Sequence, residues 1–295
     1  MTDVKTTQPI LVTGATGTVG GEVVAALRAA GAQVRALVRN DAQADAFKAA
    51  GVEPVRGDLN EPASLAGALT GAQALFLLPG YSDMPGVLNQ ARQAGVGHVV
   101  QLSGVSAASG HTDNAITAYM AASEQAVTES GLSHTIVRPS AFMANALRWA
   151  DQLRAGDTVR AQFPDVAAAV LDPADLGAVA AAALLDPERH GGRVLLPTGP
   201  EALRPAQQIA ILATALNRDL RCEPLSDEQT RAQMVADGTP EKYIEAFFDF
   251  YVAGAIDESP VRPVVAEVTG RPPRTFSDWA TAHSAEFGPR RTPDR

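Results

Sequence analysis

The stretch VTGATGTVGGEVVAALRAAG at residues 12–31 decides the fold. Its first three glycines stand three residues apart, between a predicted strand at 10–13 and a predicted helix at 19–30. In such a turn the glycines permit a tight bend, a close approach of backbone to a pyrophosphate, and close helix–strand packing. Free N–H groups at the helix start also favour phosphate charge. The pattern therefore predicts a dinucleotide site made by Gly14, Thr16, Gly17, Thr18, Val19 and Gly20.

The following hundred residues repeat the same strand-then-helix order. Short aliphatic strands are predicted at 33–38, 52–56, 72–78, 98–102 and 133–138, with helices between them at 42–50, 62–69, 85–94 and 115–130. Strands separated by helices of this length imply βαβ units and a parallel sheet with right-handed crossovers. We therefore expect an α/β protein with a Rossmann-type doubly wound parallel sheet and a smaller C-terminal substrate lobe.

The regular alternation ends after Pro139, and this sets the expected domain organisation. Residues 1–160 are predicted to form the dinucleotide-binding Rossmann domain. Residues 161–288 are predicted to form a smaller, mainly helical substrate lobe, with strands near 166–171 and 193–197 rejoining the Rossmann fold. Residues 289–295 are expected to be a disordered tail.

Composition and charge exclude several classes of protein. The 24 Lys and Arg residues against 33 Asp and Glu leave a formal net charge of −9, which disfavours nucleic-acid and membrane partners. The polar N-terminus lacks a signal peptide's apolar run, and the apolar stretch 176–185 is too short to cross a bilayer. We therefore expect a cytoplasmic protein. Cys222 is the single cysteine, and no His or carboxylate spacing indicates a metal site.

The end of the second predicted strand indicates which cofactor is used. About 20 residues after the glycine turn, NAD-binding folds carry an acid for the adenosine ribose. This chain has Arg39 there instead, and a guanidinium suits a 2′-phosphate through charge-assisted hydrogen bonds. We therefore expect NADP(H) to be preferred over NAD(H), the alternative being that Arg39 is a solvated surface residue. At the end of the third strand, Asp58 beside Leu59 either accepts from the adenine amino group or caps the next helix.

Six stretches of this sequence resemble the NmrA-like, atypical branch of the short-chain dehydrogenase/reductase superfamily. They are VTGATGTVGGEVVAALRAAG, ALVRN, GVEPVRGDL, HVVQLSGVSA, ESGLSHTIVRPSAFMAN and GRPPRTFSDWATAHSAEF. The resemblance implies a reductase that uses NAD(P)H to reduce quinones, azo dyes or other small molecules. The same family also contains NADP-binding proteins that regulate transcription without catalysis.

One departure from the superfamily pattern bears on the chemistry. Most members use a Tyr-x-x-x-Lys pair, in which the lysine lowers the pKa of the tyrosine so that it can transfer a proton. Aligned on Glu124 and residues 130–132, this pair would fall at Ile116 and Met120. None of the four tyrosines has a lysine four residues later. The sequence therefore disfavours the epimerase and alcohol dehydrogenase activities that depend on that tyrosine.

Three polar residues are candidates for catalysis. Ser103 ends the fifth strand and resembles the superfamily's substrate-side serine, which would also place it beside the nicotinamide; its hydroxyl could instead bond the next loop. Tyr119 lies three residues after the usual tyrosine position, on nearly the same helix face. It is a candidate proton donor or ring contact, the alternative being a packed or surface-exposed residue. His111 stands in a polar loop above the sheet edge, as a proton donor or as an exposed histidine.

Two turns are expected to line the cofactor and the substrate. Leu78 and Pro79 follow the fourth strand and should contact the cofactor, with Tyr81 as a lid over the substrate. After the sixth strand, Pro139 and Phe142 should pack on the nicotinamide end. Phe142 and Met143 are also predicted to wall the substrate pocket, with core packing as the alternative.

These observations predict an NADPH-dependent oxidoreductase that transfers a hydride to a quinone-like or other conjugated small molecule. Such an acceptor needs mainly alignment and shielding from water, so the absence of the Tyr–Lys pair is tolerated. The alternative is a non-catalytic NADP(H) sensor that acts through a protein partner. A homodimer is compatible with the sequence.

Overall fold

The computed structural model describes residues 8–288, and the predicted tail at 289–295 lies outside this range. A seven-stranded sheet with all neighbours parallel organises the larger lobe, in the order β3-β2-β1-β4-β5-β6-β8. Its strands are β1 (Ile10–Val12), β2 (Val34–Val38), β3 (Glu53–Arg56), β4 (Ala74–Leu77), β5 (His98–Leu102), β6 (Ser133–Val137) and β8 (Val194–Leu195). The strand order reverses between β1 and β4, and ligands bind at such a switch point in open α/β sheets.

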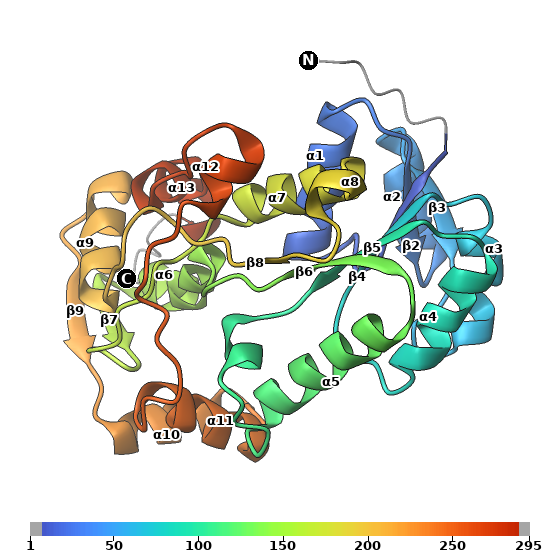
Figure 1. The fold of residues 1–295 in the computed structure, drawn as a ribbon. Helices are drawn as coiled ribbons and strands as arrows, with labels where there is room; N and C mark the ends of the chain where they lie inside the picture. The colour runs from blue at the N-terminus through green and yellow to red at the C-terminus, as the bar shows by residue number, and fades with distance from the viewer. Residues whose placement is uncertain (1–7, 289–295) are drawn as a thin grey trace.

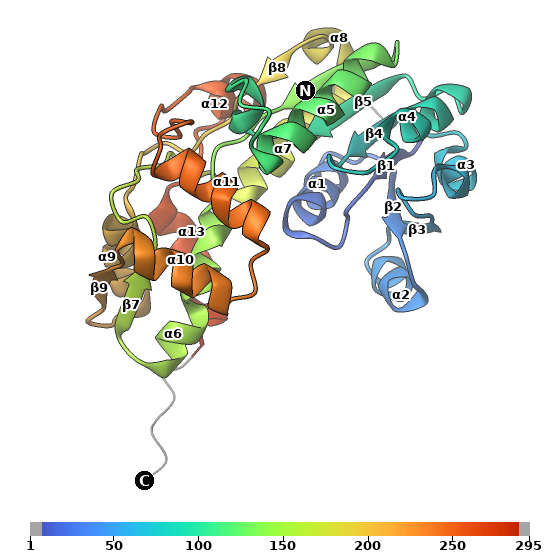
Figure 2. The ribbon, with the colours of Figure 1, turned by 90° about the horizontal axis from the view of Figure 1, so that it is seen from below.

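Helices cover both faces of this sheet, as Figures 1 and 2 show. One apolar core joins the sheet to α1 (Thr18–Ala29), α7 (Pro173–Leu185) and α12 (Val264–Thr269). A second core joins it to η1 (Pro62–Leu65), α3 (Ala66–Leu69), α4 (Met84–Gln93) and α5 (Ala115–Glu129). The remaining short elements around the sheet are α2 (Asp41–Ala49), η2 (Val105–Ala108) and α8 (Pro187–His190). The predicted doubly wound Rossmann-type fold is thereby confirmed.

A smaller lobe lies beside the sheet, on the left in Figure 1. Its core is built around Trp149, Trp279, Phe276 and Phe287, all nearly inaccessible to solvent. Two parallel strands, β7 (Thr158–Ala161) and β9 (Arg221–Pro224), form a separate sheet that the sequence did not indicate. The helices of this lobe are η3 (Met143–Trp149), α6 (Ala150–Ala155), α9 (Pro205–Leu216), α10 (Asp227–Ala236), α11 (Glu241–Tyr251), α13 (Phe276–Ala282) and η4 (Ser284–Phe287).

The boundary between the lobes differs from a simple division at residue 160. Trp149, Leu153 and Val159 already belong to the smaller lobe's core, while α7 and α12 return to cover the Rossmann sheet. Residues 166–171 form no strand, although one was expected there. Ala168 N–H bonds Leu203, Ala169 N–H bonds Glu258, and Leu171 N–H bonds Ala141, so each residue has a partner in a different segment. A continuous ladder cannot form from such pairs, and the segment joins the two lobes instead.

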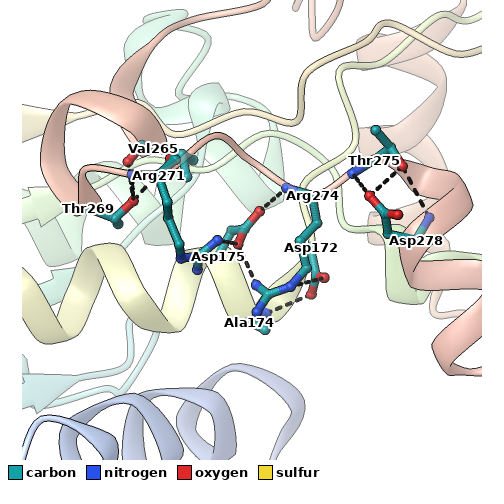
Figure 3. Close-up of polar contacts among 9 residues, drawn as sticks. All are labelled: Asp172, Ala174, Asp175, Val265, Thr269, Arg271, Arg274, Thr275 and Asp278. Carbon is teal, nitrogen blue, oxygen red and sulfur yellow. Dashed lines mark hydrogen bonds and ion pairs between the residues drawn. The ribbon is translucent and has the colours of Figure 1, made fainter.

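The start of α7 holds the C-terminal segment in place (Figure 3). Asp175 is fully buried and accepts hydrogen bonds from Arg271 Nη1 at 2.6 Å, Arg274 Nη1 at 2.5 Å and the Arg274 backbone N–H at 2.6 Å. Asp172 caps the helix by accepting from Ala174 N–H at 2.8 Å. A buried carboxylate needs such partners to offset its lost hydration. The contacts attach the segment before α13 to the helix that packs on α1.

No helix within residues 8–288 combines the length and the apolar character required to span a membrane.

Candidate cofactor and substrate site

The glycine turn presents bare backbone at the carboxyl end of β1. Gly14 has φ +61°, and a Cβ there would lie 2.3 Å from Leu78 Cδ1. A Cβ at Gly20 would lie 2.2 Å from the Gly14 carbonyl oxygen, so helix α1 can approach the strand only without a side chain. Gly17 is the N-cap of α1 and supplies no side-chain cap. The first N–H groups of α1 therefore have no capping partner from that residue, which suits an anionic ligand.

The predicted turn residues divide into an outer and an inner set. Thr16, Gly17 and Thr18 are exposed on the outside of the turn, where a ligand would contact them. The Val19 side chain packs in the core between α1 and the sheet, and Gly20 is buried. Only backbone atoms of this inner pair can take part in binding.

A buried threonine that the sequence reasoning missed couples the glycine turn to the loop after β4. Thr13 Oγ1 donates to the Phe76 carbonyl at 2.9 Å and accepts from Leu78 N–H at 3.0 Å. The hydroxyl thus holds the ends of two neighbouring strands together where the chain order reverses. Its position directly before Gly14 is the one sequence signal that would have singled it out.

Arg39 directly follows β2, and its side chain is exposed. Its backbone N–H bonds Gln43 Oε1 at 3.1 Å, and its guanidinium makes no hydrogen bond or ion pair with any described residue. Arg35, the arginine within β2, has partners in the protein: Nη1 donates to the carbonyls of Ala68 and Thr70 at 2.8 Å each, and Nε forms an ion pair with Glu53. Arg39 is therefore the strand's available cation for a 2′-phosphate.

Asp58 and Tyr81 lie at the same edge of the site as Arg39. Asp58 Oδ1 accepts from the backbone and side-chain nitrogens of Asn60, closing a turn; the following 3₁₀ helix has Glu61 at its N-cap, so Asp58 does not cap it. Burial raises the pKa of Tyr81, with Arg39 opposing and Asp58 adding to the shift. Tyr81 is thus within electrostatic reach of the two residues expected at the adenosine end.

The Leu59 side chain does not face a ligand. It is 4% exposed and packs with Leu37 and Leu65 beneath the edge of the sheet. Any contact it makes with an adenine would come from its backbone.

The loop after β4 rests on α5 through Gly80. Gly80 has φ +89°, and a Cβ there would lie 3.2 Å from the ring of Tyr119. Gly80 N–H bonds Ser123 Oγ at 2.9 Å, and that hydroxyl donates to the Tyr119 carbonyl at 2.7 Å. Burial raises the pKa of Tyr119, and Tyr243 adds to the shift. Tyr119 and Tyr81 line one cavity of about 450 Å³ beside Pro85, so the structure brings these two predicted residues together.

Ser103 is part of a buried charged network. Its hydroxyl donates to Glu124 Oε1 at 2.5 Å, and Arg138 binds the same carboxylate with Nε at 2.8 Å and Nη2 at 2.5 Å. The hydrogen bond to Glu124 is the main cause of the raised pKa of Arg138. Because its proton is held by the carboxylate, Ser103 can offer a substrate only its oxygen lone pairs. In the sequence Glu124 served only to align the Tyr–Lys positions, and its role as the acceptor for Ser103 and Arg138 was not predicted.

His111 lies away from the other candidates. It is exposed and lines a separate cavity of about 530 Å³ between the loop 110–115 and α11. Asn114 holds this loop to α11 by donating to the Ala246 carbonyl at 3.0 Å and to Asp249 Oδ2 at 2.9 Å. His111 thus lines a different cavity from the one that Tyr81 and Tyr119 share.

Phe142 lies where the sheet edge meets the smaller lobe. It follows the Arg138–Pro139 turn, forms a single β-bridge with Leu171, and lines a cavity between the lobes. Its neighbour Met143 is fully buried in the smaller lobe's core, as the packing alternative had it. The inter-lobe cavity has a volume of about 60 Å³, and its lining includes Phe142, Asn145, Arg148, Gln162, Phe163 and Tyr251.

The lining of this inter-lobe cavity also includes a carboxyl group and a phenol that are hydrogen-bonded to each other. Tyr251 Oη donates to Glu258 Oε2 at 2.9 Å. Burial is the main reason that the pKa of each group is raised, which favours the uncharged phenol and weakens the acidity of the carboxyl group. Neither Tyr251 nor Glu258 was predicted from the sequence to line this site.

The geometry at the glycine turn indicates a dinucleotide. Within residues 8–288 no group of three or more His, Cys, Asp or Glu side chains is arranged to hold a metal ion. An uncapped helix start, a crowded glycine turn and an available arginine converge instead on the carboxyl ends of β1 and β2. These residues fit the pyrophosphate and the adenosine 2′-phosphate of NADP(H).

Comparisons with known proteins agree with this arrangement. The chain is 40% identical over 286 residues to the (4-alkanoyl-5-oxo-2,5-dihydrofuran-3-yl)methyl phosphate reductase of Streptomyces griseus, covering 95% of this chain and 99% of that protein. It is 37% identical over 285 residues to the NAD(P)H azoreductase of Xenophilus azovorans, with the same coverage. Among solved structures, the NADPH-dependent quinone oxidoreductase QOR2 of Escherichia coli matches with TM-score 0.77 and 25% identity, covering 92% of this chain and 98% of that one.

A family model decides the assignment. The model of the NmrA-like family matches residues 6–280, which span the glycine turn, the Ser103–Glu124–Arg138 network and most of the C-terminal segment held by Asp175. The resemblance seen in the sequence motifs is thereby confirmed, and this chain belongs to the NmrA-like family.

Proposed function

We propose that this protein takes NADPH in preference to NADH and transfers a hydride to a quinone-like or other conjugated small molecule. The reductase class itself is confirmed by the relatives that match almost the whole chain, which are named as an azoreductase, a furanone phosphate reductase and a quinone oxidoreductase. The preference for NADPH and the nature of the acceptor are our proposals.

One observation carries the cofactor proposal. Arg39 directly follows β2, at the strand end where the adenosine ribose is expected, and its guanidinium lacks a partner among the described residues. A phosphate there would gain charge-assisted hydrogen bonds that the ribose hydroxyl of NADH cannot supply.

The site can support reduction of a conjugated acceptor without the superfamily's usual acid. When bound, the reduced nicotinamide supplies the hydride. The acceptor takes up that hydride and one proton, and the resulting oxyanion is stabilised by its own conjugation. Ser103 holds its proton against Glu124, so we assign the proton to water or to Tyr119, whose raised pKa keeps the phenol protonated. Phe142 at the sheet edge would then shield the nicotinamide end from water.

Steady-state kinetics with both cofactors tests the proposal. We expect NADPH-dependent reduction of 1,2-naphthoquinone or menadione. The Arg39→Ala variant should raise the KM for NADPH roughly 10- to 100-fold, from the loss of one or two charge-assisted hydrogen bonds, and change that for NADH less than about 3-fold. Lys48→Ala, on the neighbouring helix α2, removes the same charge and serves as the control. Equal losses with both cofactors would refute the role of Arg39.

The same assay separates the reductase from a cofactor sensor. A protein that binds NADPH and NADP⁺ with micromolar affinity but turns over no member of a quinone and azo-dye panel would contradict the proposed acceptor class. It would favour the alternative of a regulator that acts through a protein partner.

A further inference from the structure

The inter-lobe cavity contains a cation without a counter-ion. Arg148 belongs to η3, two turns along the chain from Phe142, and both residues line this cavity. No hydrogen bond or ion pair joins the Arg148 guanidinium to any part of the chain that the structure describes. The guanidinium carbon lies over the Trp149 ring, 5.2 Å from the ring centroid. Arginine remains charged in proteins, so the cavity carries a positive charge that the protein leaves unpaired.

The surroundings make this charge unusual for a surface arginine. The side chain is accessible to solvent, yet the protein packs around it so closely that desolvation lowers the pKa of Arg148. Solvent accessibility and partial desolvation occur together when a side chain lines a cavity that is open to solvent. Because water around such a group is restricted, an anion brought into the cavity would be screened less than on an open surface.

The cavity's own carboxyl group does not neutralise Arg148. Glu258 is 9% exposed, and its Oε2 accepts a hydrogen bond from the Tyr251 hydroxyl. A further hydrogen bond from the Ala141 backbone reaches this carboxyl group, and burial dominates its raised pKa. Glu258 is thus engaged with other donors, and no ion pair joins it to Arg148 in residues 8–288.

Two amide side chains extend the polar wall. Asn145 lies one turn before Arg148 on η3, and Gln162 follows β7; both line the cavity, and neither side chain has a hydrogen-bond partner in the described chain. Together with the guanidinium they provide several N–H donors directed at one space. Such a donor set matches the oxygens of a phosphate, sulfonate or carboxylate.

Aromatic rings form the rest of the wall. Phe163 contacts Tyr251 with ring centroids 5.1 Å apart and Phe248 at 5.5 Å, and Phe142 stands on the side toward the sheet edge. Phe163 has φ +47°, a conformation that is costly for a residue with a side chain and that holds its ring in this position. Flat faces with one cation beside them suit a planar acceptor that carries a negative group.

We propose that Arg148, with Asn145 and Gln162, is the recognition site for an anionic substituent on a planar substrate. The inference rests on the proposed reductase function and narrows its substrate class to conjugated acceptors with a phosphate, sulfonate or carboxylate group. The cavity of about 60 Å³ takes the anionic group beside η3, and the conjugated part of the substrate lies outside it, toward Phe142 and the cofactor.

Binding of a matched pair of probes tests the anion site without turnover. We expect the full-length protein, titrated by calorimetry with and without NADP⁺, to bind 2-naphthalenesulfonate at least about 10-fold more tightly than 2-naphthalenesulfonamide, its uncharged counterpart. Arg148→Met should abolish the preference and change the Kd of the sulfonamide less than about 3-fold, while Arg148→Lys retains part of it. Arg92→Met removes an exposed arginine of α4 and should behave as the wild type.

Three results would overturn the proposal. They are an absence of preference in the wild type, a preference that survives in Arg148→Met, and a loss in that variant confined to NADP⁺, which would assign Arg148 to the cofactor. The melting temperature of Arg148→Met shows that the variant is folded.

Turnover of 1,2-naphthoquinone and its 4-sulfonate separates this inference from the proposed function. We expect the wild type to reduce the sulfonate with kcat/KM about 10-fold or more above the neutral quinone, and Arg148→Met to lose that advantage. Reduction of both quinones without preference refutes the anion site alone. Arg148-dependent binding of the naphthalene sulfonate without reduction of either quinone refutes the reductase proposal and leaves the anion site standing.

Discussion

Replacing Glu124 by glutamine probes the network that joins the ends of β5 and β6 to α5. The carboxylate accepts three hydrogen bonds, one from Ser103 and two from Arg138, at 2.5 to 2.8 Å. Glutamine keeps the size of the side chain but removes its charge and turns one acceptor into an N–H donor. That donor would face the N–H groups of Arg138, so the guanidinium would lose its counter-ion and at least one hydrogen bond.

The magnitude follows from the burial of the pair. Removing one partner of a buried ion pair costs about 3–5 kcal/mol because the other charge stays uncompensated. The side chains of Arg138 and Glu124 are 20% and 9% exposed, so partial hydration of the arginine favours the lower end, about 3 kcal/mol. At roughly 2–4 °C per kcal/mol for chains of comparable size, we expect Glu124→Gln to lower Tm by about 6–12 °C.

Differential scanning calorimetry measures this effect, with two further variants for comparison. Asp151→Asn breaks the surface ion pair between Asp151 and Arg154, in which the Asp151 side chain is 95% exposed. This variant should leave Tm within about 1 °C of the wild type. Glu124→Met combined with Arg138→Met removes both charges and should be more stable than Glu124→Gln, since no lone charge stays buried. A Tm for Glu124→Gln as high as that of Asp151→Asn would refute the reasoning, as would a double variant less stable than the single one.

Two other predictions concern packing and pH. Gly20→Ala should abolish measurable NADPH binding or cost about 1–3 kcal/mol in stability, because the added Cβ would lie 2.2 Å from the Gly14 carbonyl oxygen. Gly21→Ala is the control and should be tolerated, because the nearest atom to its added Cβ is 3.5 Å away. Equal effects of the two variants in cofactor titrations and melting curves would contradict this. His98 is 1% exposed, and burial, followed by the charges of His134 and His190, lowers its pKa to about 4. Its pKa in the folded protein lies below the unfolded value of about 6.5, so between these two values the unfolded chain binds more protons than the folded one. The contribution of His98 to stability is therefore fully present above pH 6.5 and is lost as the pH falls toward 4, which lowers the free energy of unfolding by about 3 kcal/mol. Urea denaturation at pH 7.5, 6 and 5 should show this slope in the wild type and a shallower one in His98→Gln; parallel slopes would argue against it.

The nucleotide-binding half was predictable because its signals are local. The glycine spacing, the aliphatic strands and the helices between them depend on neighbours a few residues away. The alternation they form permits essentially one parallel topology with right-handed crossovers. Arg39 and Asp58 were placed by the same logic, since a residue that ends a parallel strand must lie at the carboxyl edge of the sheet.

The candidate site was harder to predict than the fold because its side chains choose partners far along the chain. Ser103 was expected near the nicotinamide or bonded to the next loop, but its partner Glu124 lies 21 residues later, on α5. Tyr81 was expected over the substrate, and its neighbour in the same cavity, Tyr119, comes from α5 far along the chain. Met143 and Leu59 were chosen from their place after a strand, and the packing of their apolar side chains turned them into the core.

The sequence by itself determined the Rossmann sheet, the open glycine turn, the NmrA-like family and the absence of the Tyr–Lys pair, all of which are written in short spacings. Only the tertiary structure decided what surrounds the site: the β7–β9 sheet, the segment 166–171 shared between the lobes, and the cavity in which Arg148, Gln162 and Tyr251 meet. These three residues come from separate segments of the smaller lobe, and no local pattern relates them. Their proximity results from long-range burial of apolar surface, which constrains each segment only when all the others are in place.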